Sequence, residues 1–200
     1  MNNDRPLPRR GRPRSTLVDK ALAEAARDEF IAKGFRAMNM ESIAARAGVS
    51  KVSLYRRWSS KTEAAADALR LLGDMGPSKD HGSLEADILA LFTATINSNE
   101  ARASAKFLMR TMGEISEYPE LLAIYRTKLL GPRIEQVRVI IERARMRGDL
   151  ANMLTDVAAA AVAGPLFLYS LILLADPDHD WPNDLAHQLT RTILQGIGRN

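Results

Sequence analysis

The sequence predicts an all-α protein in which a small N-terminal domain of short helices precedes a larger helical bundle, about nine helices in all. Three observations carry this prediction. Apolar residues recur at spacings of three and four through most of the chain, which is the helical period. We find neither the alternating pattern of strands nor an internal repeat. Glycine, proline and capping residues separate the periodic segments and mark the helix ends.

The first helix is expected to run from Thr16 to Gly34. A Thr16-x-x-Asp19 capping box can bond the free N–H groups at its start. Gly34 supplies the left-handed residue that commonly ends a helix. The apolar residues between them lie at helical spacing: Val18, Leu22, Ala25, Ala26 and Phe30.

Three shorter helices follow within the same domain. Asn39 is a suitable N-cap for the second helix, and Ser50 for the third. A Ser60-x-x-Glu63 capping box opens the fourth, which extends to about Leu72.

A loop at residues 73–82, with three glycines and a proline, ends this domain. Beyond it, helical periods predict helices over 83–98, 101–116, 119–147, 153–175 and 184–197. The chain therefore divides into a disordered basic arm (1–14), a small helical domain (15–72), a linker loop (73–82) and a second helical domain (83–200).

The composition fits a soluble globular chain with a substantial core, since 46% of its 200 residues are hydrophobic and 26% charged. The sequence has no cysteine, which excludes disulfides, thiolate nucleophiles and cysteine metal sites and suits a reducing cytoplasm. The arginine- and proline-rich start is not followed by the apolar segment of a secretory signal. We expect a cytoplasmic protein.

The net charge of +4 is unevenly distributed. Residues 1–14 carry five arginines against one aspartate, and residues 15–61 carry nine basic and five acidic side chains. Residues 62–200 carry fourteen basic and eighteen acidic side chains. A positive N-terminal third joined to a negative remainder indicates a nucleic-acid-binding domain attached to a domain of another kind.

The segment GVSKVSLYRRWSSK, at residues 48–61, carries the strongest functional signal. Leu54 and Trp58 are four apart and face the core, which leaves Val52, Ser53 and Arg56 pointing outward. Two short helices joined by a tight Gly-Val turn form a helix-turn-helix, whose second helix enters the DNA major groove. The alternative is an ordinary solvated helix face.

The outward side chains suit base edges. Arg56 can donate to guanine O6 and N7, Ser53 can bond to several bases, and Val52 can contact a thymine methyl group. Lys51 and Tyr55 lie on a flank of the helix, nearer to phosphates. Lys61 lies in the first turn of the next helix, where the helix N-terminus also attracts phosphate.

Residues 38–69, MNMESIAARAGVSKVSLYRRWSSKTEAAADAL, resemble the DNA-binding segment of the TetR/AcrR family of bacterial transcriptional regulators. The resemblance covers about residues 16–70. It implies that Lys51, Val52 and Ser53 read bases and that Tyr55 and Lys61 contact phosphates. Glu41 departs from the basic or neutral residue found in some members, so the second helix is left out of base reading.

The N-terminal arm is a second candidate DNA reader. Its RGRPR segment resembles an AT-hook core, in which Arg10, Arg12 and Arg14 would enter the minor groove. The alternative is a generic basic tail that raises affinity without reading sequence.

Residues 83–200 resemble the C-terminal domain of the same family only weakly, through an RGDL turn at 147–150 and a GPLF segment at 164–167. The resemblance implies dimerisation through the last two helices and a small-molecule pocket among the others. Candidate wall residues are mostly apolar, as ligand sites are: Phe92, Ile96, Phe107, Arg110, Thr111, Met112, Tyr125, Leu129 and Phe167. The alternative is ordinary core packing, with Arg110 extended to solvent.

The uncharged segment Val157–Ala175 is long enough to span a membrane. Its Gly164-Pro165 pair and the acidic residues after it, without cationic or aromatic anchors, favour burial in a dimer bundle instead. We expect no membrane partner.

No catalytic, metal or cofactor site is predicted. The three histidines, His81, His179 and His187, lack nucleophile or metal partners, and the DPDHD segment at 176–180 lacks calcium-loop spacing. The leading hypothesis is a homodimeric repressor that binds a palindromic operator and is released by a small, largely apolar effector. The fourth helix is predicted to be the only helix connecting pocket and DNA. Alternatives are an effector-independent regulator, an activator, or a helical enzyme with a basic surface.

Overall fold

The computed structural model describes residues 16–74, 76, 78–96, 99–150, 154–176 and 182–197. Within these ranges the chain is helical and contains no strand. The elements are α1 (Thr16–Lys33), α2 (Met40–Arg46), α3 (Lys51–Arg57), α4 (Lys61–Gly73), α5 (Leu84–Ile96), α6 (Asn99–Glu114), α7 (Glu120–Tyr125), a π-helical turn η1 (Arg126–Leu130), α8 (Gly131–Arg147), α9 (Thr155–Ala175) and α10 (Leu185–Ile197). The predicted all-α fold is confirmed.

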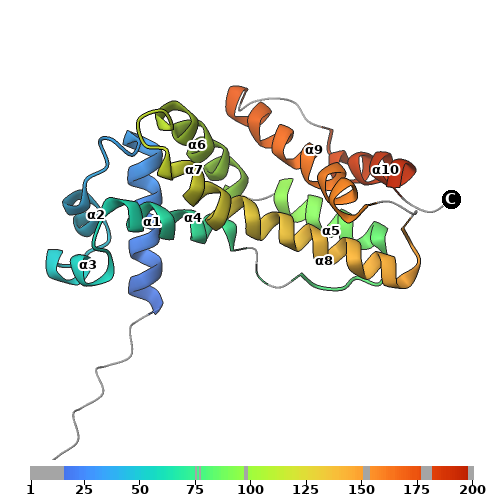
Figure 1. The fold of residues 1–200 in the computed structure, drawn as a ribbon, viewed down its shortest axis with the longest axis horizontal. Helices are drawn as coiled ribbons and strands as arrows, with labels where there is room; N and C mark the ends of the chain where they lie inside the picture. Colours follow the sequence, from blue (N-terminus) through green and yellow to red (C-terminus); the bar gives the residue numbers. More distant parts are fainter. Residues whose placement is uncertain are drawn as a thin grey trace, which may run out of the picture.

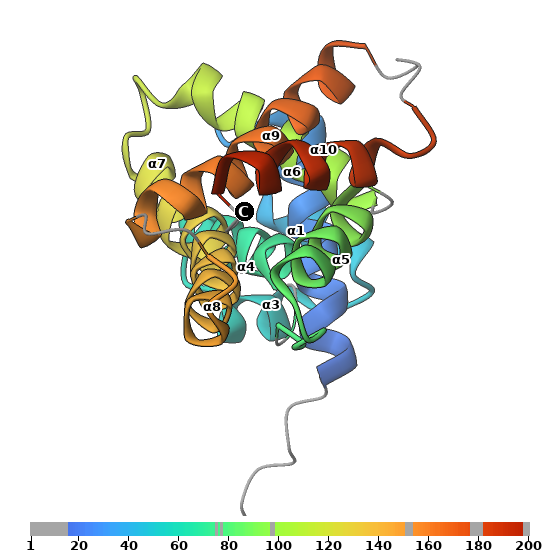
Figure 2. The same cartoon turned by 90° about the vertical axis from the view of Figure 1, so that its right-hand side faces the viewer.

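The helices form an elongated molecule (Figure 1). α1–α4 lie at one end with α6 and α7 beside them, and α5, α8, α9 and α10 form the other end. Viewed toward that second end, α10 lies in front with α5 and α8 beneath it (Figure 2). α4 and α8 connect the two ends (Figure 1).

The predicted caps form around α2, α3 and α4. The Asn39 side chain accepts hydrogen bonds from two N–H groups of α2, and Ser50 Oγ accepts one from Ser53. Ser60 Oγ accepts from the Glu63 N–H, while the Glu63 carboxylate bonds to Ser59 rather than to Ser60. The proposed cap of α1 is not tested, because α1 already begins at Thr16, the first described residue.

The single helix predicted over residues 119–147 is interrupted by the π-helical turn η1. Pro132 has no N–H to bond the carbonyl of Lys128, and its ring would clash with that carbonyl in a regular helix. The Gly131 N–H instead bonds to Arg126 O, five residues back. The displaced Lys128 carbonyl lies against α4, so that a Cβ on Gly73 would be 2.4 Å from it.

The loop between α4 and α5 is fastened to α8. Arg143 donates to the carbonyl and hydroxyl oxygens of Ser78, and Arg147 pairs with Asp80 at 2.9 Å. The carboxylate of Asp149 accepts hydrogen bonds from Arg147 Nε and from the N–H of Leu84 at the start of α5. The RGDL turn is therefore a cap for α5 as well as the end of α8.

The buried apolar residues form two main clusters that do not divide at the linker loop. The first cluster joins α1–α4 to α6, α7 and η1 through Phe107, Leu108, Leu121, Tyr125 and Leu129. The second joins α5, α8, α9 and α10. The first four helices thus share one core with part of the following domain.

Candidate DNA-binding face and ligand cavity

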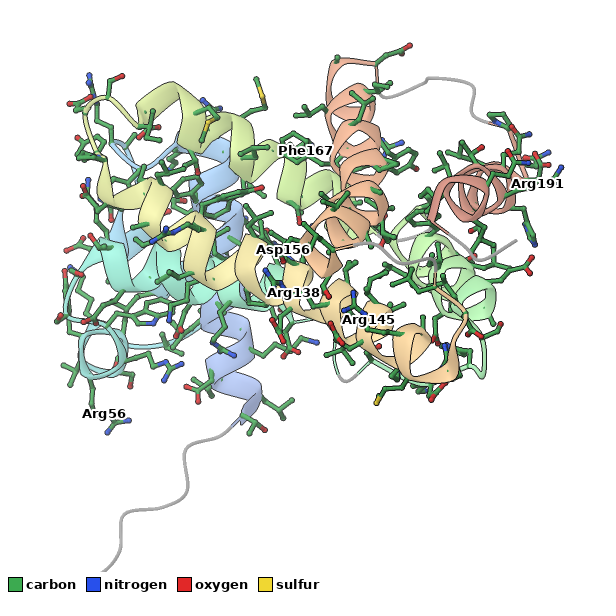
Figure 3. The ribbon with its side chains drawn as sticks, turned by 45° about the vertical axis from the view of Figure 1, so that its right-hand side comes forward. Arg56, Arg138, Arg145, Asp156, Phe167 and Arg191 are labelled. Atoms are coloured by element: carbon green, nitrogen blue, oxygen red, sulfur yellow. The ribbon has the colours of Figure 1, made fainter. Side chains whose placement is uncertain are left out.

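The outward face of α3 is exposed at Val52 and Arg56, as the sequence predicts, whereas Ser53 is only partly exposed. Leu54 is fully buried and Trp58 is 2% exposed. On the opposite side Val52 is 78% exposed and Tyr55 is 53% exposed. Arg56 points away from the rest of the chain at that end of the molecule (Figure 3). α3 therefore presents an apolar, an aromatic and a cationic side chain to solvent on one exposed surface.

Asp67 of α4 fixes the end of α3. Its Oδ2 accepts hydrogen bonds from Trp58 Nε1 at 2.9 Å and from Arg57 Nη2 at 2.6 Å. Burial alone would raise the pKa of Asp67. The hydrogen bond from Trp58 and the charges of Arg57 and Arg70 have a larger opposite effect, so the pKa of Asp67 lies below its ordinary value. The contact is therefore complete at neutral pH and is lost only as the pH falls through that lowered pKa.

Lys51 and Lys61, at the flanks of this face, are bonded to other groups of the chain. The ammonium group of Lys51 pairs with Glu41 of α2. Lys61 Nζ donates to the carbonyl oxygens of Phe35, at 3.1 Å, and Arg36, at 3.3 Å. A phosphate contact by either lysine would therefore be shared with groups of this chain. Ser53 is partly buried and accepts a hydrogen bond from Ser50 Oγ.

The arm residues Arg10, Arg12 and Arg14 lie outside the described residues. Their minor-groove role stays a prediction.

A cavity of about 270 Å³ lies between the two cores, at the lower end of the size of ligand sites. Residues of α4, α5, α6, α7, η1, α8 and α9 line it, so every helix between the linker loop and α9 contributes. The walls are mainly apolar, and the polar side chains among them are Asp74, Thr95, Ser104, Tyr125, Arg133 and Ser170.

Three of the nine candidate wall residues line this cavity: Tyr125, Leu129 and Phe167. In Figure 3, Phe167 lies on the side of α9 nearest α6. The other six, Phe92, Ile96, Phe107, Arg110, Thr111 and Met112, do not line it. Helical spacing places a residue on an inward face, but it does not tell which neighbouring helix that face meets.

The six displaced candidates have ordinary structural roles. Phe92 is buried in the second core, with Ile96 packed against it, whereas Phe107 stacks on Phe30 of α1 with ring centroids 3.7 Å apart. Thr111 is buried and donates to the Phe107 carbonyl, whereas Met112 is 42% exposed. Arg110 donates to the Ile31 and Ala32 carbonyls, so it caps the C-terminal end of α1.

Arg133 is a cationic residue of the cavity wall that the sequence pattern did not identify. Arg133 Nη2 donates to Leu72 O at 3.0 Å and to Ser104 Oγ at 2.9 Å, which places its guanidinium between the ends of α4 and α6. The sequence signal near it is the Gly131-Pro132 pair, which marks the interruption before α8.

Comparison with known proteins now decides the family. A profile described as "Bacterial regulatory proteins, tetR family" matches residues 22–74. A second, described as "Tetracyclin repressor-like, C-terminal domain", matches residues 78–189, more than half of the chain. The chain belongs to the TetR family. Members of this family are DNA-binding transcriptional regulators, so the prediction of a regulator rather than an enzyme is confirmed and the enzyme alternative is wrong.

Individual relatives in the family match this chain over at least 80% of its length. The chain is 33% identical over 194 residues to YdeS of Bacillus subtilis, an uncharacterised HTH-type transcriptional regulator, and the match covers 94% of each chain. It is 30% identical over 167 residues to the DNA-binding transcriptional repressor TetR of Mycobacteroides abscessus, covering 80% of this chain and 85% of that one.

Solved structures share the fold. The structure titled Flavonoid-responsive Regulator FrrA matches with a TM-score of 0.66 and 22% identity, over 93% of this chain and 100% of that one. A TetR-family regulator from Rhodococcus matches with a TM-score of 0.73 and 15% identity, over 91% of this chain and 97% of that one. Regulators of the family are cytoplasmic in bacteria, usually dimerise and typically respond to ligands.

α6 as well as α4 joins the cavity to the DNA-binding end of this TetR-family chain. α4 reaches it through Leu72 and Asp74, as expected. α6 also lines it, and its far end holds the turn between α1 and α2. Glu114 of α6 accepts hydrogen bonds from the N–H groups of Phe35, at 3.0 Å, and Arg36, at 2.8 Å. The expectation that the helix over residues 60–72 is the sole connection is therefore wrong.

α9 carries an exposed apolar face that this chain alone does not cover. Val157, Phe167 and Leu168 are 51%, 47% and 57% exposed. By length and composition its window Thr155–Ile172 could cross a membrane, and 22% of that window is buried within the chain. Exposed apolar areas of this kind mark surfaces where soluble proteins bind partners.

Among the described residues, no group of three or more histidine, aspartate or glutamate side chains could hold a metal ion. His81 bonds to the buried carboxylate of Asp87. Most of the DPDHD segment, including His179, lies outside the described residues.

Proposed function

We propose that this TetR-family chain is a homodimeric repressor that binds a palindromic operator through α3 and is released by a small, largely apolar effector. The observation that carries the proposal is the outward face of α3, where Val52, Tyr55 and Arg56 are exposed around a helix anchored by Leu54 and Trp58. Such a helix fits the major groove, and its side chains match base and phosphate groups.

The exposed face of α9 supports the dimer. A helix of this kind can pack on its own copy about a two-fold axis, which would give the protein two recognition helices. α10 lies beside α9 in the same end of the molecule (Figures 1 and 2) and would form the second helix of that interface.

The cavity supports an effector. An effector-independent regulator would be expected to have helices α5–α8 packed solid, whereas these helices surround about 270 Å³ of space. FrrA, a fold neighbour, is titled as flavonoid-responsive, and the relative from Mycobacteroides abscessus is named a repressor. The first name supports a ligand-responsive regulator, and the second supports a repressor over an activator.

We expect operator selection from random DNA to yield a palindrome whose half-sites are about 34 Å apart or a multiple of this. A symmetric dimer carries its two recognition helices at a fixed separation, so footprinting should show two related protected regions. Sedimentation of the complex should give two chains per operator. Full-affinity binding of one chain to a single half-site would contradict the proposal.

Replacing Arg56 with alanine is expected to reduce discrimination between operator and mutated operator by about 1–3 kcal/mol, because a bidentate base contact is lost. The matched control is Arg145→Ala, since Arg145 is exposed on α8, away from α3 and outside the proposed dimer helices (Figure 3). Both variants lose one positive charge. If both variants lose the same amount of discrimination in competition binding assays, Arg56 contributes only nonspecific attraction to DNA.

A further inference from the structure

The cavity holds a phenol whose hydroxyl makes no hydrogen bond to another described residue. Tyr125 is 8% exposed and lines the cavity wall. A hydroxyl at the wall of a ligand-sized cavity, without a partner among the described residues, offers a hydrogen bond to a ligand. Burial raises the pKa of Tyr125, with the charge of Arg133 acting in the opposite direction, so the phenol is protonated at neutral pH and can donate.

The other polar side chains of the wall differ in what they offer. The hydroxyls of Thr95 and Ser170 donate to carbonyl groups of their own helices, at 2.9 Å each. Their oxygens can therefore only accept a further hydrogen bond. Asp74 is exposed, and its carboxylate accepts from the Gly76 N–H.

Arg133 adds a positive charge near the phenol. Its Nη2 donates to Leu72 O and Ser104 Oγ, and its charged guanidinium group lines the same cavity as the phenol. A cation and a neutral O–H donor in apolar surroundings favour an anionic oxygen, because charge-assisted hydrogen bonds are about twice as strong as neutral ones.

Resting on the function proposed above, we infer that the effector is an apolar carboxylic acid, whose carboxylate accepts from Tyr125 and pairs with Arg133. The apolar remainder of the molecule fills the space between α5, α8 and α9. Arg133 also holds the last turn of α4 through Leu72 O. A carboxylate that attracts this guanidinium competes with the Leu72 carbonyl, so the same residue links ligand charge to the helix that carries the DNA-binding end.

The test uses the full-length protein and matched pairs of probes: decanoic acid with decanamide, and 2-naphthoic acid with 2-naphthamide. At neutral pH each acid is anionic while its amide keeps nearly the same size and apolar area. We expect at least one acid to bind, measured by calorimetry, and to bind about 10- to 100-fold more tightly than its amide.

Two substitutions locate the site. Tyr125→Phe keeps the ring and removes only the hydroxyl, and it should weaken binding of the acid about tenfold. Arg133→Gln should abolish the preference for acid over amide, whereas Arg133→Lys should keep part of it. The control is Tyr169→Phe, which removes a phenol outside the cavity, bonded to Ile96 O, and should leave acid binding unchanged.

The inference would be overturned if the amides bind as tightly as the acids, or if neither acid binds. In that case the proposed repressor function would still stand if other neutral apolar compounds released the operator. Acid binding that is insensitive to both Tyr125→Phe and Arg133→Gln would also overturn it. Acid binding that depends on both residues but leaves operator affinity unchanged would support the ligand class and refute effector release.

Discussion

Replacing Asp87 with alanine is expected to lower the free energy of unfolding by about 3–5 kcal/mol, the cost of removing one partner from a buried ion pair. The carboxylate is fully buried at the start of α5. It accepts hydrogen bonds from Arg147 Nη2 at 3.1 Å and from the His81 N–H at 2.9 Å, and Arg143 Nη2 lies 3.7 Å away. Without it, two guanidinium groups that are mostly buried lose their shared counter-charge.

The matched control for this prediction is Asp156→Ala. Asp156 also pairs with an arginine of α8, Arg138, but both side chains are exposed, at 72% and 42% (Figure 3). Surface pairs contribute about 0–1 kcal/mol, so this variant should unfold nearly as the parent does. Urea unfolding at one fixed protein concentration measures both, since dimerisation makes stability depend on concentration. Equal stability of the two variants would show that the buried network is not stabilising.

Replacing Phe107 with alanine is also expected to cost about 3–5 kcal/mol, the usual range for a buried phenylalanine. Its ring is fully buried and lies parallel to that of Phe30, with an interplanar angle of 2°. Because Phe30 belongs to α1 and Phe107 to α6, the substitution opens the core that the first four helices share with part of the following domain.

Two further measurements separate this role from ligand contact. Met109→Ala, on the same helix but 50% exposed, should change stability by no more than about 0.5 kcal/mol. Any compound that binds the cavity should bind Phe107→Ala with unchanged affinity under conditions where the variant is folded, because Phe107 does not line the cavity. A stable variant with lost ligand binding would restore the original interpretation of Phe107 as a wall residue.

The exposed side of α3 could be predicted from the sequence because its determinants are local. Caps at Asn39, Ser50 and Ser60 lie within three residues of the groups they bond. The four-residue spacing of Leu54 and Trp58 fixes which side of α3 faces inward. Such short-range rules hold whatever the rest of the chain does.

The cavity could not be predicted in the same way because its walls come from seven elements. Periodicity identifies Phe107 and Tyr125 alike as inward-facing, yet one meets Phe30 and the other meets open space. The difference arises from the relative rotation of α6, α7 and α8. That rotation depends on η1, and a uniform helical period over residues 119–147 does not contain it.

The break at η1 has a consequence for how this sequence can change. Gly73 tolerates no side chain because the Lys128 carbonyl is turned toward it, and that carbonyl is turned outward because Pro132 cannot bond to it. A larger residue at position 73 could be accommodated only after Pro132 is replaced by a residue whose N–H draws the carbonyl back into a regular helix. Two positions about sixty residues apart, one in each domain, are thus epistatic, and an evolutionary path through this contact must change α8 before it changes α4.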